Sequence, residues 1–224
     1  MKERPVIFNG EMVRAILDGR KTQTRRVMKV QPSEHFHPMN MSLELDYSAR
    51  WYTPGVVDKD GYLQPAKGQV FGVAGVDEGY ACPFGAVGDR LWVRETWAEA
   101  GASAPDLTLY RANYPAHVPA VYENVPAADE IIWRPSIHMP RWACRITLEI
   151  TAVRVERLND ISEEDAKSEG VAPSQHIITP PEALYRVGFL KLWQSIYGAE
   201  NWSANPWVWI IEFKQVSARE VERG

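Results

Sequence analysis

Two long stretches of alternating apolar and polar residues constrain the fold most strongly. The first lies within residues 142–155, where apolar side chains occupy every second position: Trp142, Cys144, Ile146, Leu148 and Ile150. The pattern resumes out of phase at Val153 and Val155, which predicts a long strand with a bulge near Thr151-Ala152. A second alternation, at Trp207, Trp209, Ile211 and Phe213, predicts a final strand.

Three shorter segments have the periodicity and the end signals of helices. Met12, Val13, Ile16 and Leu17 recur at helical spacing, with Asn9 as an N-cap and Gly19 as a terminator. Ser162 caps a second helix that Gly170 closes, and a third apolar stripe comprises Tyr185, Phe189, Leu192, Trp193 and Ile196. The order of these elements predicts an α+β fold, with a small mixed barrel or a strongly curved sheet flanked by helices.

Two loop-rich segments separate these elements. Residues 31–87 are punctuated by Pro and Gly, with a hairpin predicted around Asp60-Gly61. Residues 98–140 are also irregular, with a strand predicted at 107–111, and alternation at 90–97 predicts another strand between the two segments. We interpret 31–87 and 98–140 as insertions in one domain, residues 1–216, followed by a charged tail at 217–224.

Charge and cysteine content narrow the function classes. The net charge of the 224-residue chain is -4, which disfavours a broad, non-specific nucleic-acid binder. Cys82 and Cys144 form no disulfide framework, so a reducing cytoplasm is expected. No apolar run approaches the ~18 residues that span a bilayer, and we expect no membrane partner.

The segment Gly19-Arg20-Lys21-Thr22-Gln23-Thr24-Arg25-Arg26, here called the octet, is the strongest candidate site. It places four cations and three hydroxyl or amide side chains in eight residues, directly after the first predicted helix. Such a segment does not suit an apolar core, so it is either a solvated face or a binding site. A turn of helix, or a tight turn, would bring Lys21 and Thr24 to the same side.

The positions Gly19, Lys21, Thr24 and Arg26 resemble the GxKxxExR signature of the ASCH (activating signal cointegrator homology) domain, of the PUA-like superfamily. Thr24 replaces the usual Glu, as in the bacterial N4-acetylcytidine amidohydrolases, small ASCH enzymes. Residues 88–97, 137–142 and 205–209 extend the resemblance to phage and prophage ASCH-like proteins. The resemblance implies a PUA-like small mixed β-barrel; the two insertions have no counterpart in the small amidohydrolases.

In those amidohydrolases a Lys, a Thr and a Glu form the proposed catalytic set. The matching residues are Lys21, Thr24 and Glu169. A Thr hydroxyl becomes a nucleophile when a base takes its proton, and a Lys with a lowered pKa can be that base. The resemblance therefore implies binding of a modified nucleoside or RNA, and, more specifically, hydrolysis of an amide on an N4-acylcytidine-like base, without a cofactor.

Further side chains are candidates for substrate binding. Those in the octet are Arg20, Arg25 and Arg26, which suit a phosphate or a carbonyl group. Those in the strand at 90–97 are Trp92, Arg94 and Glu95, which suit stacking and hydrogen bonding to a base. Glu95 is the alternative to Glu169 as the site carboxylate. His35, His37, Cys82 and His138 lack zinc-site spacing, and we expect no metal.

Three other functions compete with hydrolysis. A non-catalytic RNA- or DNA-binding module would use the four cations of the octet as phosphate contacts. A ribonuclease would cleave RNA strands. A protein-interaction factor would bind a host or phage partner through the insertions.

Overall fold

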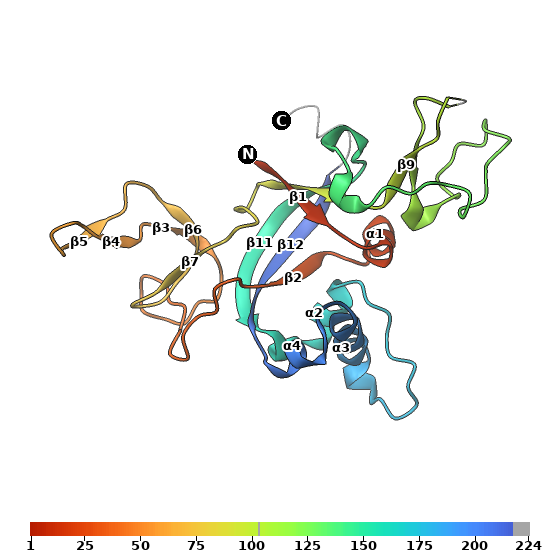
Figure 1. Cartoon of the computed structure of the whole chain (residues 1–224). Coiled ribbons are helices and arrows are strands. Elements are labelled where there is room, and N and C mark those ends of the chain that lie inside the picture. The colour runs from red at the N-terminus through yellow and green to blue at the C-terminus, as the bar shows by residue number, and fades with distance from the viewer. Residues whose placement is uncertain (103, 217–224) are drawn as a thin grey trace.

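A five-stranded, strongly curved sheet is the centre of the fold (Figure 1). The computed structural model describes residues 1–102 and 104–216. Across the sheet the strands are β1 (Glu3–Ile7), β8 (Arg90–Arg94), β11 (Thr147–Arg157), β12 (Trp207–Val216) and β2 (Gln23–Val27). The β1 and β8 strands are parallel, and all other neighbours in this sheet are antiparallel. The predicted tail at 217–224 lies outside the described residues.

The long pair β11 and β12 confirms the predicted bulge. Their register shifts between Ile150 and Ala152, after which Val153 pairs with Ile211 and Val155 with Trp209. The extra residue restores the alternation, so the apolar residues on both sides of the bulge share one buried cluster.

The first residues of the predicted long strand are not in a strand. Residues Arg141–Ala143 form a short 3-10 helix, and the Trp142 side chain is 66% exposed. Its ring contacts Trp97 edge-on, with centroids 5.4 Å apart, instead of joining the core. The strand begins only at Thr147, where both β8 and β12 supply ladder partners.

Helices pack on both faces of the sheet. They are α1 (Gly10–Leu17), α2 (Glu163–Ser168), α3 (Leu184–Tyr197) and α4 (Ala199–Ser203). Val13 and Ile16 of α1 join the cluster that includes Trp209 and Ile211, whereas Val208 and Ile210 face α2 and α3. The caps are those predicted: Asn9 accepts from Met12 N, and Ser162 from Asp165 N.

Within the described residues the sheet does not close into a barrel. β1 and β2 are its two edges, and α1, which follows β1 directly, lies between them in Figure 1. A side chain bridges the edges: Arg26 Nη2 donates to the carbonyl oxygen of Ile7 at 3.0 Å. The prediction of a curved sheet flanked by helices is confirmed; the prediction of a closed barrel is not.

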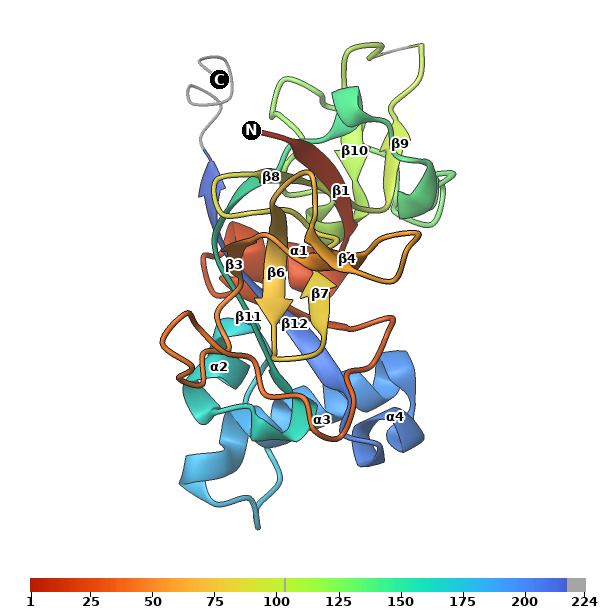
Figure 2. The ribbon, with the colours of Figure 1, turned by 90° about the vertical axis from the view of Figure 1, so that its left-hand side faces the viewer.

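The two insertions form small sheets of their own (Figure 2). In the first, β3 (Arg50–Tyr52), β6 (Val70–Ala74) and β7 (Gly79–Ala81) make one sheet, and β4 (Gly55–Val57) and β5 (Leu63–Pro65) form the predicted hairpin. Phe36 and Phe71 of this insertion belong to the main core cluster. Its position is therefore fixed by packing against the sheet.

The predicted strand at 90–97 is divided between two sheets. β8 ends at Arg94, and β9 (Trp97–Glu99) pairs with β10 (Thr108–Tyr110) in the second insertion. Short 3-10 helices occupy Arg111–Asn113, Ser136–His138, Leu158–Asp160 and Pro181–Ala183. Of the described helices, none is long and apolar enough to cross a membrane.

Two glycines with positive φ test how tightly the elements are packed. Gly170 has φ +77°, and a Cβ there would lie 2.7 Å from Lys21 Cβ and 2.8 Å from Ala15 Cβ. Gly19 has φ +73° but faces open space. Gly19→Ala should therefore cost about 1 kcal/mol from the backbone alone, and Gly170→Ala about 1 to 3 kcal/mol more from overpacking.

Urea unfolding of the two variants measures this difference. Both substitutions introduce the same residue at nearly the same φ, so Gly19→Ala is the matched control for Gly170→Ala. Equal losses of unfolding free energy would contradict the close packing of α2 against Lys21 and α1.

Candidate functional site

The octet is part of the sheet, not a turn beside it. α1 ends before Gly19, Lys21 forms an isolated bridge with Glu169, and β2 begins at Gln23. The β2 strand ends at Val27, one residue beyond the octet. Because side chains alternate along a strand, Gln23 and Arg25 face α2, and Thr24 and Arg26 face the opposite side.

Lys21 and Glu169 form a buried ion pair. Lys21 Nζ lies 2.8 Å from Glu169 Oε2 and 2.9 Å from the Glu169 carbonyl oxygen. The two side chains are 0% and 3% exposed. The bridge between Lys21 and Glu169 fixes the end of α2 beside the octet, so the structure joins two of the three predicted catalytic residues.

Burial lowers the pKa of the Lys21 ammonium below its usual 10.5. The Glu169 carboxylate opposes this shift, and the positive charges of Arg26 and Arg25 add to it. The Glu169 carboxylate has a second cation, because Arg25 Nη1 donates to Oε1 at 3.2 Å. Lys21 can therefore lose its proton without leaving a buried carboxylate unpaired.

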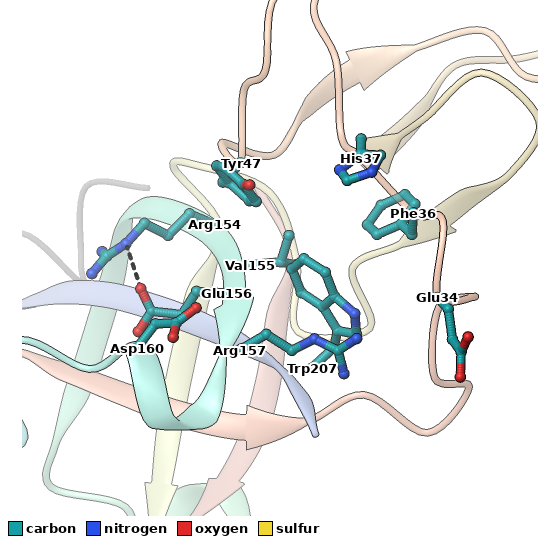
Figure 3. Close-up of a pocket in the computed structure, with 10 residues that line it drawn as sticks. All are labelled: Glu34, Phe36, His37, Tyr47, Arg154, Val155, Glu156, Arg157, Asp160 and Trp207. Atoms are coloured by element: carbon teal, nitrogen blue, oxygen red, sulfur yellow. Dashed lines mark ion pairs between the residues drawn. The ribbon is translucent and has the colours of Figure 1, made fainter. Parts of the chain in front are cut away.

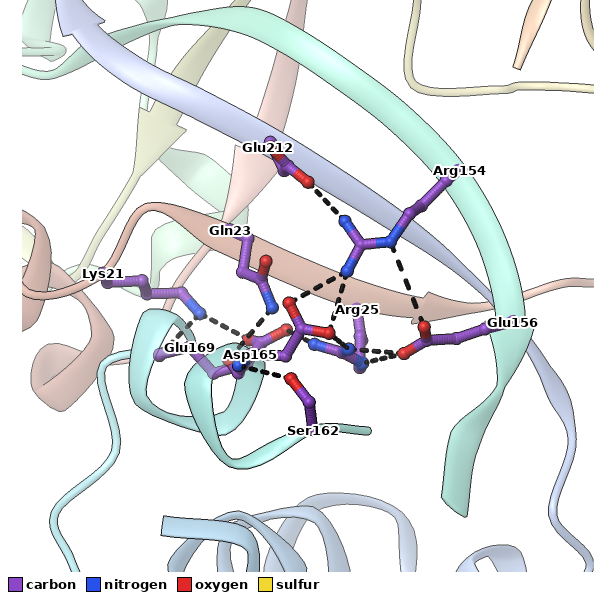
Figure 4. A network of polar contacts seen from close by, with 9 residues as sticks. All are labelled: Lys21, Gln23, Arg25, Arg154, Glu156, Ser162, Asp165, Glu169 and Glu212. Atoms are coloured by element: carbon purple, nitrogen blue, oxygen red, sulfur yellow. Dashed lines mark hydrogen bonds and ion pairs between the residues drawn. The ribbon is translucent and has the colours of Figure 1, made fainter. Parts of the chain in front are cut away.

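Arg25 is the centre of a larger polar network (Figure 4). Its side chain is fully buried, and it pairs with Glu156 of β11, with Asp165 of α2 at 3.1 Å and with Glu169. The predicted role of Arg25 in substrate binding does not suit this position, because its guanidinium already pairs with three carboxylates. Arg25 instead holds Glu169 in place.

Arg154 of β11 extends the network on its solvent side. Its guanidinium pairs with Asp165 at 2.9 Å and with Glu212 of β12. Burial alone would raise the pKa of the Asp165 carboxyl, but Arg25 and Arg154 hold it below its usual value. Sequence patterns did not indicate this network. The only signal was indirect: the regular alternation after the bulge places Arg154 and Glu156 on the same face of β11.

A cleft opens beside this network, between β1, α1, β2 and α3. Its wide part has a volume of about 560 Å³, and its narrow part, of about 20 Å³, reaches Thr24, Arg25 and Glu169. The two parts share four lining residues: Met12, Arg26, Ile196 and Tyr197. A volume of 20 Å³ has room for about one water molecule. The narrow part is therefore a small space at Thr24, Arg25 and Glu169, and Lys21 is not among the described residues that line either part.

Thr24 and Arg26 line this cleft from one face of β2. The cations of Lys21 and Arg26 both lie over the Phe8 ring, 5.6 and 5.3 Å from its centroid. The Thr24 side chain is buried, and it shares the narrow space with Glu169. Within residues 1–102 and 104–216, no hydrogen bond joins the Thr24 hydroxyl to Lys21 Nζ. Among the described residues, the Lys21 ammonium donates to two oxygens of Glu169. The third of its three N–H groups has no acceptor there.

The other predicted site residues lie outside the cleft floor. Arg20 is at the surface, where it bonds Asp18 and the carbonyl oxygen of Gly170. Arg94 lies over the ring of Trp92 and donates to the Ile137 carbonyl oxygen. Trp92, Arg94 and Glu95 are not among the described residues that line the cleft.

Glu95 belongs to a separate buried cluster beneath the second insertion. Arg145 donates to both of its carboxylate oxygens, at 2.8 and 2.9 Å, and also lies 4.0 Å from the centroid of the Tyr110 ring. Of these two carboxylates, Glu169 contacts Lys21 and Glu95 pairs with Arg145.

Comparison with protein-family models, with curated proteins and with solved structures found no match for this chain. Within the described residues, no group of three or more His, Cys, Asp and Glu side chains is arranged to hold a metal ion. The chemistry of the site must therefore be argued from its own geometry.

Replacing Arg25 tests the structural importance of the network. Arg25→Met would leave three carboxylates without their shared cation, and we expect a loss of about 3 kcal/mol in unfolding free energy. Arg20→Met is the control, because Arg20 is half-exposed and pairs only with Asp18 and a carbonyl among the described residues. Its cost should stay below about 1 kcal/mol. Equal costs, measured by urea unfolding, would contradict the network's role.

Proposed function

We propose that the chain is an ASCH-type, PUA-like domain that binds a modified nucleoside or an RNA element in the cleft beside the octet. We further propose that it hydrolyses an amide on an N4-acylcytidine-like base. The buried contact between Lys21 Nζ and Glu169 carries this proposal. A lysine with a lowered pKa, held by a carboxylate at the end of a cleft, has the properties of a general base.

The first half of the reaction transfers the acyl group to Thr24. Neutral Lys21 Nζ takes the proton of the Thr24 hydroxyl, and Oγ1 attacks the acyl carbonyl carbon. The C–N bond of the amide breaks, and the proton on Lys21 passes to the departing amine of the base. The base then leaves with a free amino group, and Thr24 carries an acyl ester.

The second half uses water. Lys21, neutral again, takes a proton from a water molecule that attacks the ester carbonyl. Thr24 Oγ1 leaves with that proton, and the acyl group departs as a carboxylic acid, which then loses its remaining proton to solvent water. The narrow space at the cleft floor is large enough for this one water.

Glu169 and the remaining cations have supporting roles. Glu169 orients Lys21, and Arg25 fixes Glu169, so both are positioning residues. Arg26 lines both parts of the cleft, where it can hold a carbonyl or a phosphate of the substrate. The apolar side chains of Met12, Ile196 and Tyr197 offer a surface to the base.

The burial of the octet's cations disfavours the simplest competing function. A non-catalytic phosphate-binding patch would keep its cations at the surface, because burying them costs free energy. Two of the four cations, Lys21 and Arg25, are instead buried against carboxylates. Arg20 and Arg26 alone remain for phosphate contacts.

Deacylation of N4-acetylcytidine, followed by mass spectrometry, tests the proposal. Thr24→Val removes the nucleophile and should lower turnover at least about 10³-fold, while Thr24→Ser keeps a hydroxyl and should retain part of it. Thr22→Val is the matched control, because Thr22 is exposed in the same octet and should leave turnover unchanged.

Turnover should also depend on the protonation of Lys21. Because only neutral Lys21 is a base, kcat/KM should rise with pH through a pKa below 10.5. Lys21→Arg should remove this rise and lower the rate about 10²- to 10⁴-fold.

Turnover that survives both Thr24→Val and Lys21→Arg would exclude the mechanism. RNA binding without turnover would favour the non-catalytic module, and RNA strand cleavage would favour the ribonuclease.

A further inference from the structure

A second pocket lies where the first insertion meets the sheet, outside the cleft described above (Figure 3). Its volume is about 550 Å³, within the range of small-molecule sites. Phe36 and Tyr47 come from the insertion, and Arg157 and Trp207 come from the ends of β11 and β12. The pocket thus exists only because the insertion packs on the sheet.

The rings of Phe36, Tyr47 and Trp207 line this pocket together with five charged side chains. The planes of Tyr47 and Trp207 are 25° apart with centroids separated by 6.3 Å, and Phe36 meets Trp207 edge-on at 5.5 Å. Tyr47 is 40% exposed, so part of its ring is open to a ligand, whereas Phe36 and Trp207 are buried. An exposed ring supported by buried rings is a preorganised stacking surface.

The pocket also contains polar groups without partners. Trp207 is only 6% exposed, and its Nε1–H has no hydrogen-bond partner in the described part of the chain. Figure 3 shows the nitrogen-bearing edge of the indole turned toward the side where Glu34 lies. Glu34 is exposed, and no hydrogen bond or ion pair joins it to any described residue. A buried donor left unpaired costs free energy, which a ligand acceptor would recover.

Arg157 adds a cation near these groups. Its guanidinium lies over the Trp207 ring, 4.9 Å from the centroid, and donates one long hydrogen bond to the Asn205 carbonyl oxygen. Arg has five N–H donors, so most of them are free for a ligand's phosphate or sugar oxygens. Arg154, by contrast, is occupied by Asp165 and Glu212.

We propose that this pocket binds a nucleobase that stacks on Tyr47, with its hydrogen-bonding edge toward Trp207 Nε1–H and the Glu34 carboxylate. A base offers what both groups lack: a ring acceptor or carbonyl for the indole donor, and an amino or imino N–H for the carboxylate. A peptide's Phe side chain offers no polar edge, and its Trp side chain offers a donor only. This inference does not rest on the hydrolytic mechanism.

Binding of nucleotides to the full chain tests the inference. The probes are cytidine and guanosine 5′-monophosphate as free nucleotides, and a five-residue single-stranded RNA of mixed sequence. We expect saturable binding that Tyr47→Ala weakens about tenfold, as loss of one stacking partner does. Tyr47→Phe keeps the ring and should retain the affinity. Tighter binding of the RNA would identify a base within a strand as the ligand; tighter binding of the mononucleotides would identify free nucleotides.

Control variants locate the bound base. Tyr62→Ala removes an exposed tyrosine from the same insertion that does not line the pocket, so affinity should be unchanged. Glu34→Gln, at an exposed position, should weaken binding of both mononucleotides without unfolding the chain.

Absence of saturable binding, or binding that Tyr47→Ala leaves intact, would overturn the inference. Binding that only Arg26→Ala weakens would place the base in the cleft and also overturn it. Because Thr24→Val leaves this pocket untouched, failure of deacylation and failure of base binding are separate results.

Discussion

The ion pairs that bury Arg25 are the interaction on which the rest of the site depends. A guanidinium withdrawn from water is tolerated only where carboxylates and hydrogen bonds replace its hydration. Here Glu156 of β11 and the Asp165 and Glu169 side chains at α2 replace it. One side chain of β2 therefore connects that strand to β11 and α2, whose contacting residues lie 131 to 144 positions later in the sequence. The position of Glu169, and with it the environment of Lys21, follows from this arrangement.

The same network gives Lys21 its chemical character. A buried lysine beside a single carboxylate would form a simple ion pair and keep its proton. Because Arg25 also contacts the Glu169 carboxylate, the charge on Lys21 is no longer needed to neutralise it. Burial, and after it the charges of two neighbouring arginines, lowers the pKa of the Lys21 ammonium below its usual value. The octet is thus divided by the fold: Lys21 and Arg25 are buried with carboxylates, and Arg20 and Arg26 stay at the surface and in the cleft.

Local signals predicted the elements better than the contacts between them. Asn9, Gly19 and the phase slip near Thr151 identified a helix and a bulged strand, because caps and alternation act over a few residues. The strand predicted from Trp142 was wrong for its first residues, since Arg141–Ala143 form a 3-10 helix in which Trp142 is exposed. The burial of Arg25 was not predicted at all. It depends on carboxylates at 156–169, and charge alone places an arginine at the surface.

The central claim is that the network makes Lys21 a buried base, and the pKa of its side chain tests this most directly. The measurement is an NMR titration of the Lys21 Cε and Nζ resonances, assigned by their loss in Lys21→Arg. The account predicts a titration midpoint below 10.5 for Lys21. In Arg25→Met, measured at temperatures where that variant is folded, the midpoint should move upward. The reason is that one repelling charge is gone and Glu169 then pairs with Lys21 alone. A midpoint at or above 10.5 in the unmodified chain would contradict the account, since Lys21 would then be an ordinary ion-paired cation.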